Sequence, residues 1–137
     1  MTEALPDLDR CEHWAFVCEA SDCRYRGAPA VRDALARAVH EGGHANVAVV
    51  RTGCLSLCGA GPAVVAYPSG DVHLQVQPAD APEMALQLAA GAPLKRRAVR
   101  APQWYRDRIA SQFSYAIRLL KQRYRRAQTP PTGAPAR

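Results

Sequence analysis

The 137-residue sequence predicts a single α/β domain, in which helices cover a small mixed β-sheet, followed by a basic α-helical extension. Three observations lead to this fold class. Apolar runs of strand length alternate with amphipathic helical periods, glycine and proline cluster between them, and the net charge changes sign late in the chain. No run reaches the ~20 apolar residues that a membrane-spanning helix needs. A domain of this length also needs no disulfide framework to hold a core.

The first half of the chain predicts a strand, a helix and a second strand. The strand is His13–Cys18 (HWAFVC), a short apolar run with aromatic and β-branched residues. A polar loop over 19–27 leads to a helix over 28–40, in which apolar residues recur every four positions. Residues 46–52 (NVAVVRT) predict the second strand, and the glycine-rich segment 53–62 (GCLSLCGAGP) excludes regular structure.

A β-hairpin and a second helix are expected next. Residues 63–67 and 72–76 flank a Pro-Ser-Gly turn signal, which predicts two paired strands. The segment 79–90 predicts a helix with Asp80 as its N-cap and Gly91 at its end. The order is β-α-β-β-β or β-α-β-β-α, and either gives an α/β sandwich.

Charge divides the chain after residue 94. Residues 1–94 carry six arginines and eleven acidic residues, a net charge of −5, whereas residues 95–137 carry twelve cations and one acid, a net charge of +11. Apolar residues keep helical spacing through most of the second part, between 101 and 128. We therefore divide the chain into a polar leader (1–11), an α/β domain (12–94), a basic amphipathic helix (95–128) and a disordered tail (129–137).

Four cysteines form the candidate site. Cys18 and Cys23 make a C-x4-C pair and Cys54 and Cys58 a C-x3-C pair, each where a predicted strand meets a loop. The acidic N-terminus lacks the order of a secretory signal, so we expect a cytoplasmic, reducing location, where clustered cysteines bind metal or do redox chemistry more often than they form disulfides. The fifth cysteine, Cys11, lies outside both pairs and is expected to be a peripheral thiol.

The cysteine spacing favours an iron–sulfur cluster over zinc. Zinc sites built from cysteine pairs usually place two residues between the ligands, and neither pair here does so. A [2Fe–2S] cluster is longer than a single ion and accommodates wider loops. Gly53, Gly59 and Gly61 would allow backbone N–H groups to approach cluster sulfurs closely. Arg24 and Arg26 either add positive charge near Cys23 or are simply solvated.

The segments HWAFVC-x4-CRYRGA, GCLSLCGAGPAVVAYPSGDV and PADAPEMALQLAAG resemble the thioredoxin-like [2Fe–2S] ferredoxins, across roughly residues 12–97. The resemblance implies a thioredoxin-like fold and a one-electron carrier that often forms dimers. It also implies that Cys18 and Cys23 share one iron and that Cys54 and Cys58 share the other. The C-x4-C spacing departs from members with a longer first loop, and the family core has no counterpart of the basic extension.

We therefore expect a [2Fe–2S] ferredoxin that passes single electrons between a reductase and an acceptor, without enzymatic activity or a small-molecule substrate. Val17, Leu55 and Leu57 would shield the cluster, and the acidic domain favours a basic face on a redox partner. One alternative is a dithiol oxidoreductase with Cys54 as attacking thiolate, although the usual two-residue spacing and following helix are missing. Another is a cluster-containing regulator that binds nucleic acid through its basic segment.

The histidines and the basic segment carry weaker signals. Each histidine lies apart from the others and shows no ligand spacing with the cysteines; they are His13, His40, His44 and His73. For residues 95–128 we rank docking to an acidic partner or to the chain's own acidic domain first, and a solvated helix packed by its apolar stripe second. Nucleic-acid binding and contact with an anionic membrane surface rank below both.

Overall fold

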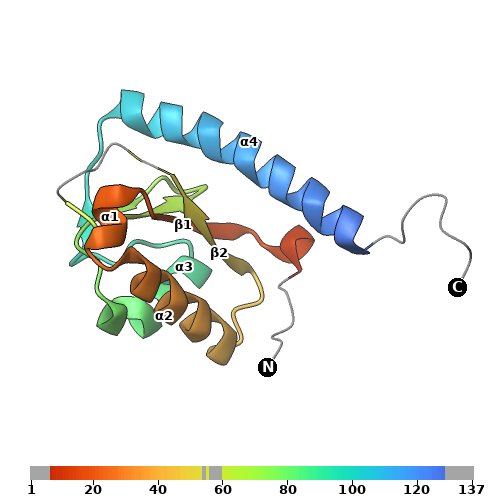
Figure 1. Ribbon diagram of the computed structural model, residues 1–137, viewed down its shortest axis with the longest axis horizontal. Helices are drawn as coiled ribbons and strands as arrows, with labels where there is room; N and C mark the ends of the chain where they lie inside the picture. The colour runs from red at the N-terminus through yellow and green to blue at the C-terminus, as the bar shows by residue number, and fades with distance from the viewer. Residues whose placement is uncertain (1–6, 54, 56–59, 129–137) are drawn as a thin grey trace, which may run out of the picture.

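The structure is a computed structural model that describes residues 7–53, 55 and 60–128 (Figure 1). In chain order its elements are η1 (Leu8–Arg10), β1 (His13–Cys18), α1 (Ser21–Tyr25), α2 (Ala28–Glu41), β2 (Val47–Thr52), β3 (Val64–Tyr67), β4 (Val72–His73), η2 (Pro78–Asp80), α3 (Ala81–Ala89), β5 (Ala98–Val99) and α4 (Gln103–Gln128). The five strands form one mixed sheet in the order β2-β1-β3-β4-β5. Helices α2 and α3 lie on one side of this sheet and α4 on the other, so the predicted α/β class is confirmed.

Strand β1 is the centre of the core. It pairs in parallel with β2, from His13 with Val47 to Cys18 with Thr52, and antiparallel with β3. All its residues after His13 are buried. A strand covered on both faces has no polar side to its sequence, which explains why the run HWAFVC is apolar almost without interruption.

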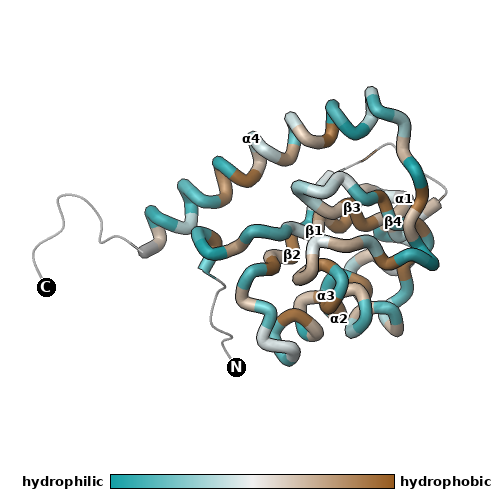
Figure 2. The backbone as a smooth tube through the Cα atoms, turned by 180° about the vertical axis from the view of Figure 1, so that it is seen from behind, coloured by the Kyte–Doolittle hydropathy of each residue, from teal (hydrophilic) through white to brown (hydrophobic). Residues whose placement is uncertain are grey.

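The long helix α4 is part of the domain's core. Its buried residues recur every four positions, at Tyr105, Ile109, Phe113 and Ile117. The Phe113 ring stacks on Phe16 of β1, with 3.8 Å between ring centroids and 13° between ring planes. Figure 2 shows hydrophilic and hydrophobic stretches alternating along α4, as expected for a helix with one buried stripe. The apolar spacing seen in the sequence therefore corresponds to packing of α4 on its own sheet.

The basic helix is shorter than predicted, because residues 95–102 are not helical. Ala98–Val99 instead forms β5, which pairs antiparallel with β4, and the helix starts at Gln103. Pro102 precedes that start, and a proline disfavours helical geometry in the residue before it. A two-residue strand has no periodicity of its own, so only its pairing partner reveals it. The predicted disordered tail, 129–137, lies outside the described residues.

Two other local predictions need correction. The segment 19–27, expected to be a loop, contains the helix α1, whose five residues are too few to show a helical period. The second hairpin strand stops at His73 rather than at residue 76, because Gln75 adopts a positive φ of 53° and the N–H groups of Gln75 and Val76 bond to the carbonyls of Ala60 and Pro62 instead of to a neighbouring strand.

Asp80 is the N-cap residue of α3, as the sequence suggests, but its side chain makes no capping bond to that helix. Its carboxylate accepts a hydrogen bond from the Gln77 N–H at 2.8 Å and pairs with Arg96 and Arg97, each at 2.9 Å. Burial raises the pKa of Asp80, but these three donors outweigh it and hold the pKa below its ordinary value. Two of the first three cations of the basic segment are thus bound to the acidic domain. Gly91, at φ 72°, ends α3 as predicted.

Candidate metal centre

The first cysteine pair lies at the carboxyl end of β1. Cys18 is the last residue of that strand, and Cys23 lies in α1, which follows directly. Each is only 2% exposed. Tyr25, two residues after Cys23, is 91% exposed, so α1 turns its cysteine inward and its tyrosine outward. Both thiols are therefore enclosed by protein at one edge of the sheet.

The segment 53–62, which carries the second pair, is anchored beside the first pair at both of its ends. On the entering side, the Glu19 N–H donates to the carbonyl of Thr52 at 2.9 Å. On the leaving side, the Cys18 N–H donates to the carbonyl of Ala63 at 3.1 Å. Cys54 and Cys58 themselves lie outside the described residues. The backbone that flanks them is nevertheless hydrogen-bonded to Cys18 and to the residue after it.

Gly61 packs closely against the first cysteine pair. A Cβ atom built on Gly61 would lie 2.6 Å from Cys23 Sγ and 3.3 Å from Cys23 Cα, distances that an alanine cannot keep without displacing its neighbours. The predicted need for a glycine therefore has a geometric basis at Gly61. Gly53 has nothing within 4 Å of such a Cβ, and Gly59 lies outside the described residues.

Helix α4 also holds the second cysteine segment. The Tyr105 hydroxyl donates a hydrogen bond to the Leu55 carbonyl oxygen at 2.5 Å. Leu55 is 2% exposed and Tyr105 is 8% exposed, so this bond is shielded from water. The helical spacing of apolar residues includes Tyr105, but nothing in the sequence predicted a partner fifty residues away. The basic extension is thus hydrogen-bonded to the residue that follows Cys54 in the sequence.

Of the two interpretations left open for the arginines beside Cys23, their exposure favours solvation. Arg24 and Arg26 are both exposed. The charged pair that the structure does bring close is Glu19, directly after Cys18, with Arg32 of α2. The Glu19 side chain is nearly buried, so its ion pair with Arg32 compensates a negative charge next to a cysteine.

Val17 and Leu55, two of the three residues expected to shield a cluster, are buried. Leu57, the third, lies outside the described residues. Both of the described shielding candidates are therefore excluded from solvent, as expected.

His73 is the one histidine buried in the core among the described residues. Its Nε2 accepts the Leu94 N–H at 3.0 Å, which leaves Nδ1 to donate to the Val64 carbonyl at 3.1 Å. Burial lowers the pKa of His73, so the ring stays neutral. Both ring nitrogens are used by the backbone, and the ring joins β4, β3 and the segment before β5.

Cys11 lies at the other end of β1 from the candidate site. Its thiol donates to the Asp7 carbonyl at 3.5 Å, and burial raises its pKa. Cys11 and Cys18 are seven residue steps apart along extended chain, about 23 Å at the usual rise per residue. Cys11 is therefore a protonated thiol remote from the paired cysteines, in agreement with its expected peripheral place.

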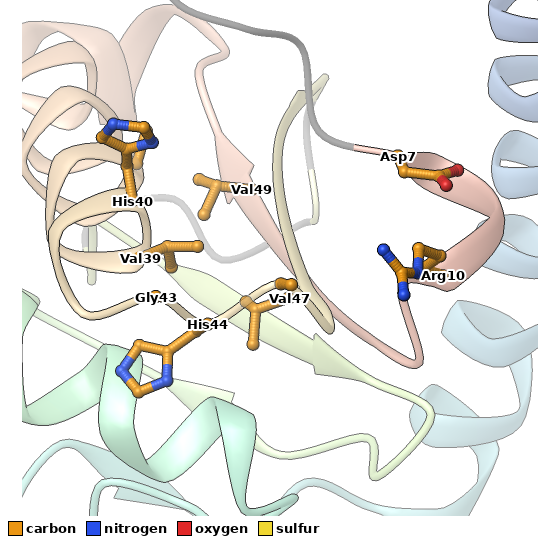
Figure 3. A pocket seen from close by; sticks show the side chains of 10 residues that line it. Asp7, Arg10, Val39, His40, Gly43, His44, Val47 and Val49 are labelled. Carbon is orange, nitrogen blue, oxygen red and sulfur yellow. The ribbon is translucent and has the colours of Figure 1, made fainter.

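A pocket of about 420 Å³ opens at that same far end (Figure 3). Figure 3 shows Asp7 and Arg10 on one side of it and His40 and His44 on the other, with Val47 of β2 between them. The cysteine segments follow the carboxyl ends of β1 and β2, whereas this pocket lies where β2 begins. It is separate from the cysteine site.

The donor set fits a thiolate-bound cluster as far as it is described. Within residues 7–53, 55 and 60–128, no three histidine, cysteine or acidic side chains are grouped to hold a metal ion. Two of the four expected ligands lie outside those ranges. Two buried thiols, a glycine backbone packed against one of them and apolar neighbours are the surroundings that iron–sulfur clusters use.

Within residues 7–53, 55 and 60–128, no helix is long and apolar enough to cross a membrane.

A mixed sheet between helices, with paired cysteines after parallel strands, defines a thioredoxin-like α/β protein with a cysteine site. Among solved structures the chain is similar to a thioredoxin-like [2Fe–2S] ferredoxin from Aquifex aeolicus, with a TM-score of 0.61 and 28% identity over 66% of this chain and 94% of that one. A second structure of that ferredoxin, the wild type at 1.5 Å resolution, has a TM-score of 0.60 and 27% identity, over 65% of this chain and 97% of that one. No family model and no curated protein matches the chain.

These comparisons confirm the resemblance inferred from the cysteine segments and the thioredoxin-like fold. They cover almost the whole of the ferredoxin but leave about a third of this chain without a counterpart. The chain therefore has the fold of an iron–sulfur electron carrier and additional structure beyond it.

Proposed function

We propose that this chain binds one [2Fe–2S] cluster and carries single electrons between protein partners. One observation supports this most strongly. Both ends of the segment that carries Cys54 and Cys58 are hydrogen-bonded at Cys18 and Glu19, while Gly61 packs on the Cys23 sulfur. The similarity to thioredoxin-like [2Fe–2S] ferredoxins supports an iron–sulfur cluster as the group that these cysteines bind.

In this proposal the cluster is held by the thiolates of Cys18, Cys23, Cys54 and Cys58 and supplies a site that stores one electron. The chain's own residues set how that site behaves. Val17 excludes water from one side, and hydrogen bonds and burial around the sulfurs tune the reduction potential. An electron carrier needs access for a partner but no substrate pocket, so we propose no enzymatic activity.

The proposal also includes a cellular location and an oligomeric state. Four ligating thiols must stay reduced before the cluster is inserted, which suits the cytoplasm. The resemblance implies a homodimer. Because α4 covers one face of the sheet, a second copy would have to use another surface (Figure 1).

The test is the visible absorption spectrum of anaerobically purified protein, with iron and acid-labile sulfide counted per chain, before and after dithionite. We expect a brown protein with two irons and two sulfides that bleaches on reduction. Cys18→Ser and Cys23→Ser should lose or alter the spectrum, whereas Cys11→Ser, the matched control, should keep it. A protein that stays colourless after anaerobic reconstitution would contradict the proposal and leave zinc or dithiol chemistry at these cysteines.

A further inference from the structure

The side of α4 that faces away from the sheet carries exposed aromatic and arginine residues. We call it the arginine–aromatic face; its members are Trp104, Arg108, Tyr115, Arg118 and Arg126. Trp104 is 66% exposed and Tyr115 is 58% exposed, which is unusual for side chains of this size. The Arg118 guanidinium lies over the Tyr115 ring, 5.7 Å from its centroid.

Packing on the domain leaves most of the positive charge of α4 exposed to solvent. Seven cations lie on the helix, and Arg125 is the one that pairs with a carboxylate in the described part of the chain, 2.7 Å from Asp9. The single acid on α4, Asp107, accepts a hydrogen bond from the Gln103 amide. The helix therefore docks on its own domain through its apolar stripe, and the charges of the arginine–aromatic face remain available to a partner.

We propose that the arginine–aromatic face docks an acidic protein surface, which for the electron carrier proposed above is a redox partner. Tryptophan, tyrosine and arginine dominate the energetics of protein–protein interfaces. The position of the face also suits this role. It begins at Trp104, next to the Tyr105 whose hydroxyl holds Leu55, so a partner seated there approaches the cysteine segment.

Charge decides between an acidic protein and other occupants. A second copy using the same face would set arginines against arginines, which is repulsive. Arg108, Arg118 and Arg126 are separated by about 15 and 12 Å along the helix axis, whereas duplex DNA carries a charge about every 1.7 Å. Residues 1–94, with a net charge of −5, would also repel a long polyanion that extends past the helix. A local acidic patch on a folded protein matches this sparse pattern better.

The experiment measures binding of a short fluorescein-labelled peptide, about 10 residues long with about four glutamates and so no longer than α4, to the full chain by anisotropy, at about 50 and 200 mM salt. The test variant is Arg108→Glu/Arg118→Glu. The matched control is Arg10→Glu/Arg37→Glu, two exposed arginines beside or near the pocket at the start of β2. Both double variants lower the formal net charge from +6 to +2, so they differ only in where the charge is changed. Circular dichroism checks that each is folded.

We expect salt-sensitive binding that weakens about tenfold or more in the test variant and less than about threefold in the control. Equal losses in the two variants, or no binding by the parent chain at low salt, would overturn the proposal. A DNA strand of equal charge, or vesicles rich in phosphatidylserine, that bind more tightly than the peptide and depend on Arg108 and Arg118 would overturn it in favour of those partners. The measurement is made with and without iron in the protein. Peptide binding by a chain that holds no iron would separate a failure of the cluster proposal from a failure of the docking proposal.

Discussion

Tyr105→Phe tests whether α4 holds the second cysteine segment. The substitution keeps the ring in the core and removes only the hydroxyl that donates to Leu55 at 2.5 Å. Because both residues are almost fully buried, the Leu55 carbonyl would be left without this donor and with little access to water. An unsatisfied buried acceptor costs about 1–3 kcal/mol, so the free energy of unfolding should fall by that amount.

Two assays are used. Urea denaturation of the iron-free chain gives the free energy of unfolding. The loss of visible absorption from the iron-loaded chain, in the presence of a chelator, gives the rate at which iron is released. Tyr105→Phe should lower the unfolding free energy and speed the loss of iron. Tyr115→Phe is the matched control, because Tyr115 lies on the same helix but is exposed; its effect should stay below about 0.5 kcal/mol. If the two variants behave alike in both assays, the hydroxyl does not hold this segment and the reasoning is refuted.

Three further predictions concern the rest of the domain. Gly61→Ala should lower the unfolding free energy in urea by about 1–3 kcal/mol, because its Cβ would press on the Cys23 sulfur, and should weaken iron retention; Gly53→Ala, with open space around it, should do neither. Asp80→Asn should cost about 2 kcal/mol in urea above pH 5, since it removes a nearly buried carboxylate from two guanidinium groups. The pKa of Asp80 is held low, so the variant and the parent should converge as the pH falls through that lowered pKa; a constant gap at acid pH would contradict this. Burial lowers the pKa of His73, so its stabilisation is complete above about pH 6.5 and is lost as the pH falls, by at most about 1.4 kcal/mol per pH unit; unfolding of the iron-free chain should show this slope, and His73→Gln should lack it.

Elements whose signal is local could be predicted from the residues alone. The run HWAFVC is apolar because β1 is covered on both faces, and such a run predicts a buried strand without any knowledge of the sheet. Helix α2 follows from apolar residues four positions apart, and so does the buried stripe of α4. The spacing of the cysteines and glycines indicated a cluster site and carried the family resemblance, because the motif is contained within short stretches of chain.

The tertiary structure alone decided the features that depend on partners distant in sequence. The two residues of β5 have no strand pattern of their own and exist as a strand only because β4 lies beside them. Asp80 occupies the N-cap position that the sequence predicts, but only the fold shows that its carboxylate binds Arg96 and Arg97 instead of capping α3. The bond from Tyr105 to Leu55 joins residues fifty positions apart. Periodicity in the sequence indicates which side of a helix or strand is buried. Which residue packs against that side depends on the tertiary fold, which brings distant segments of the chain together.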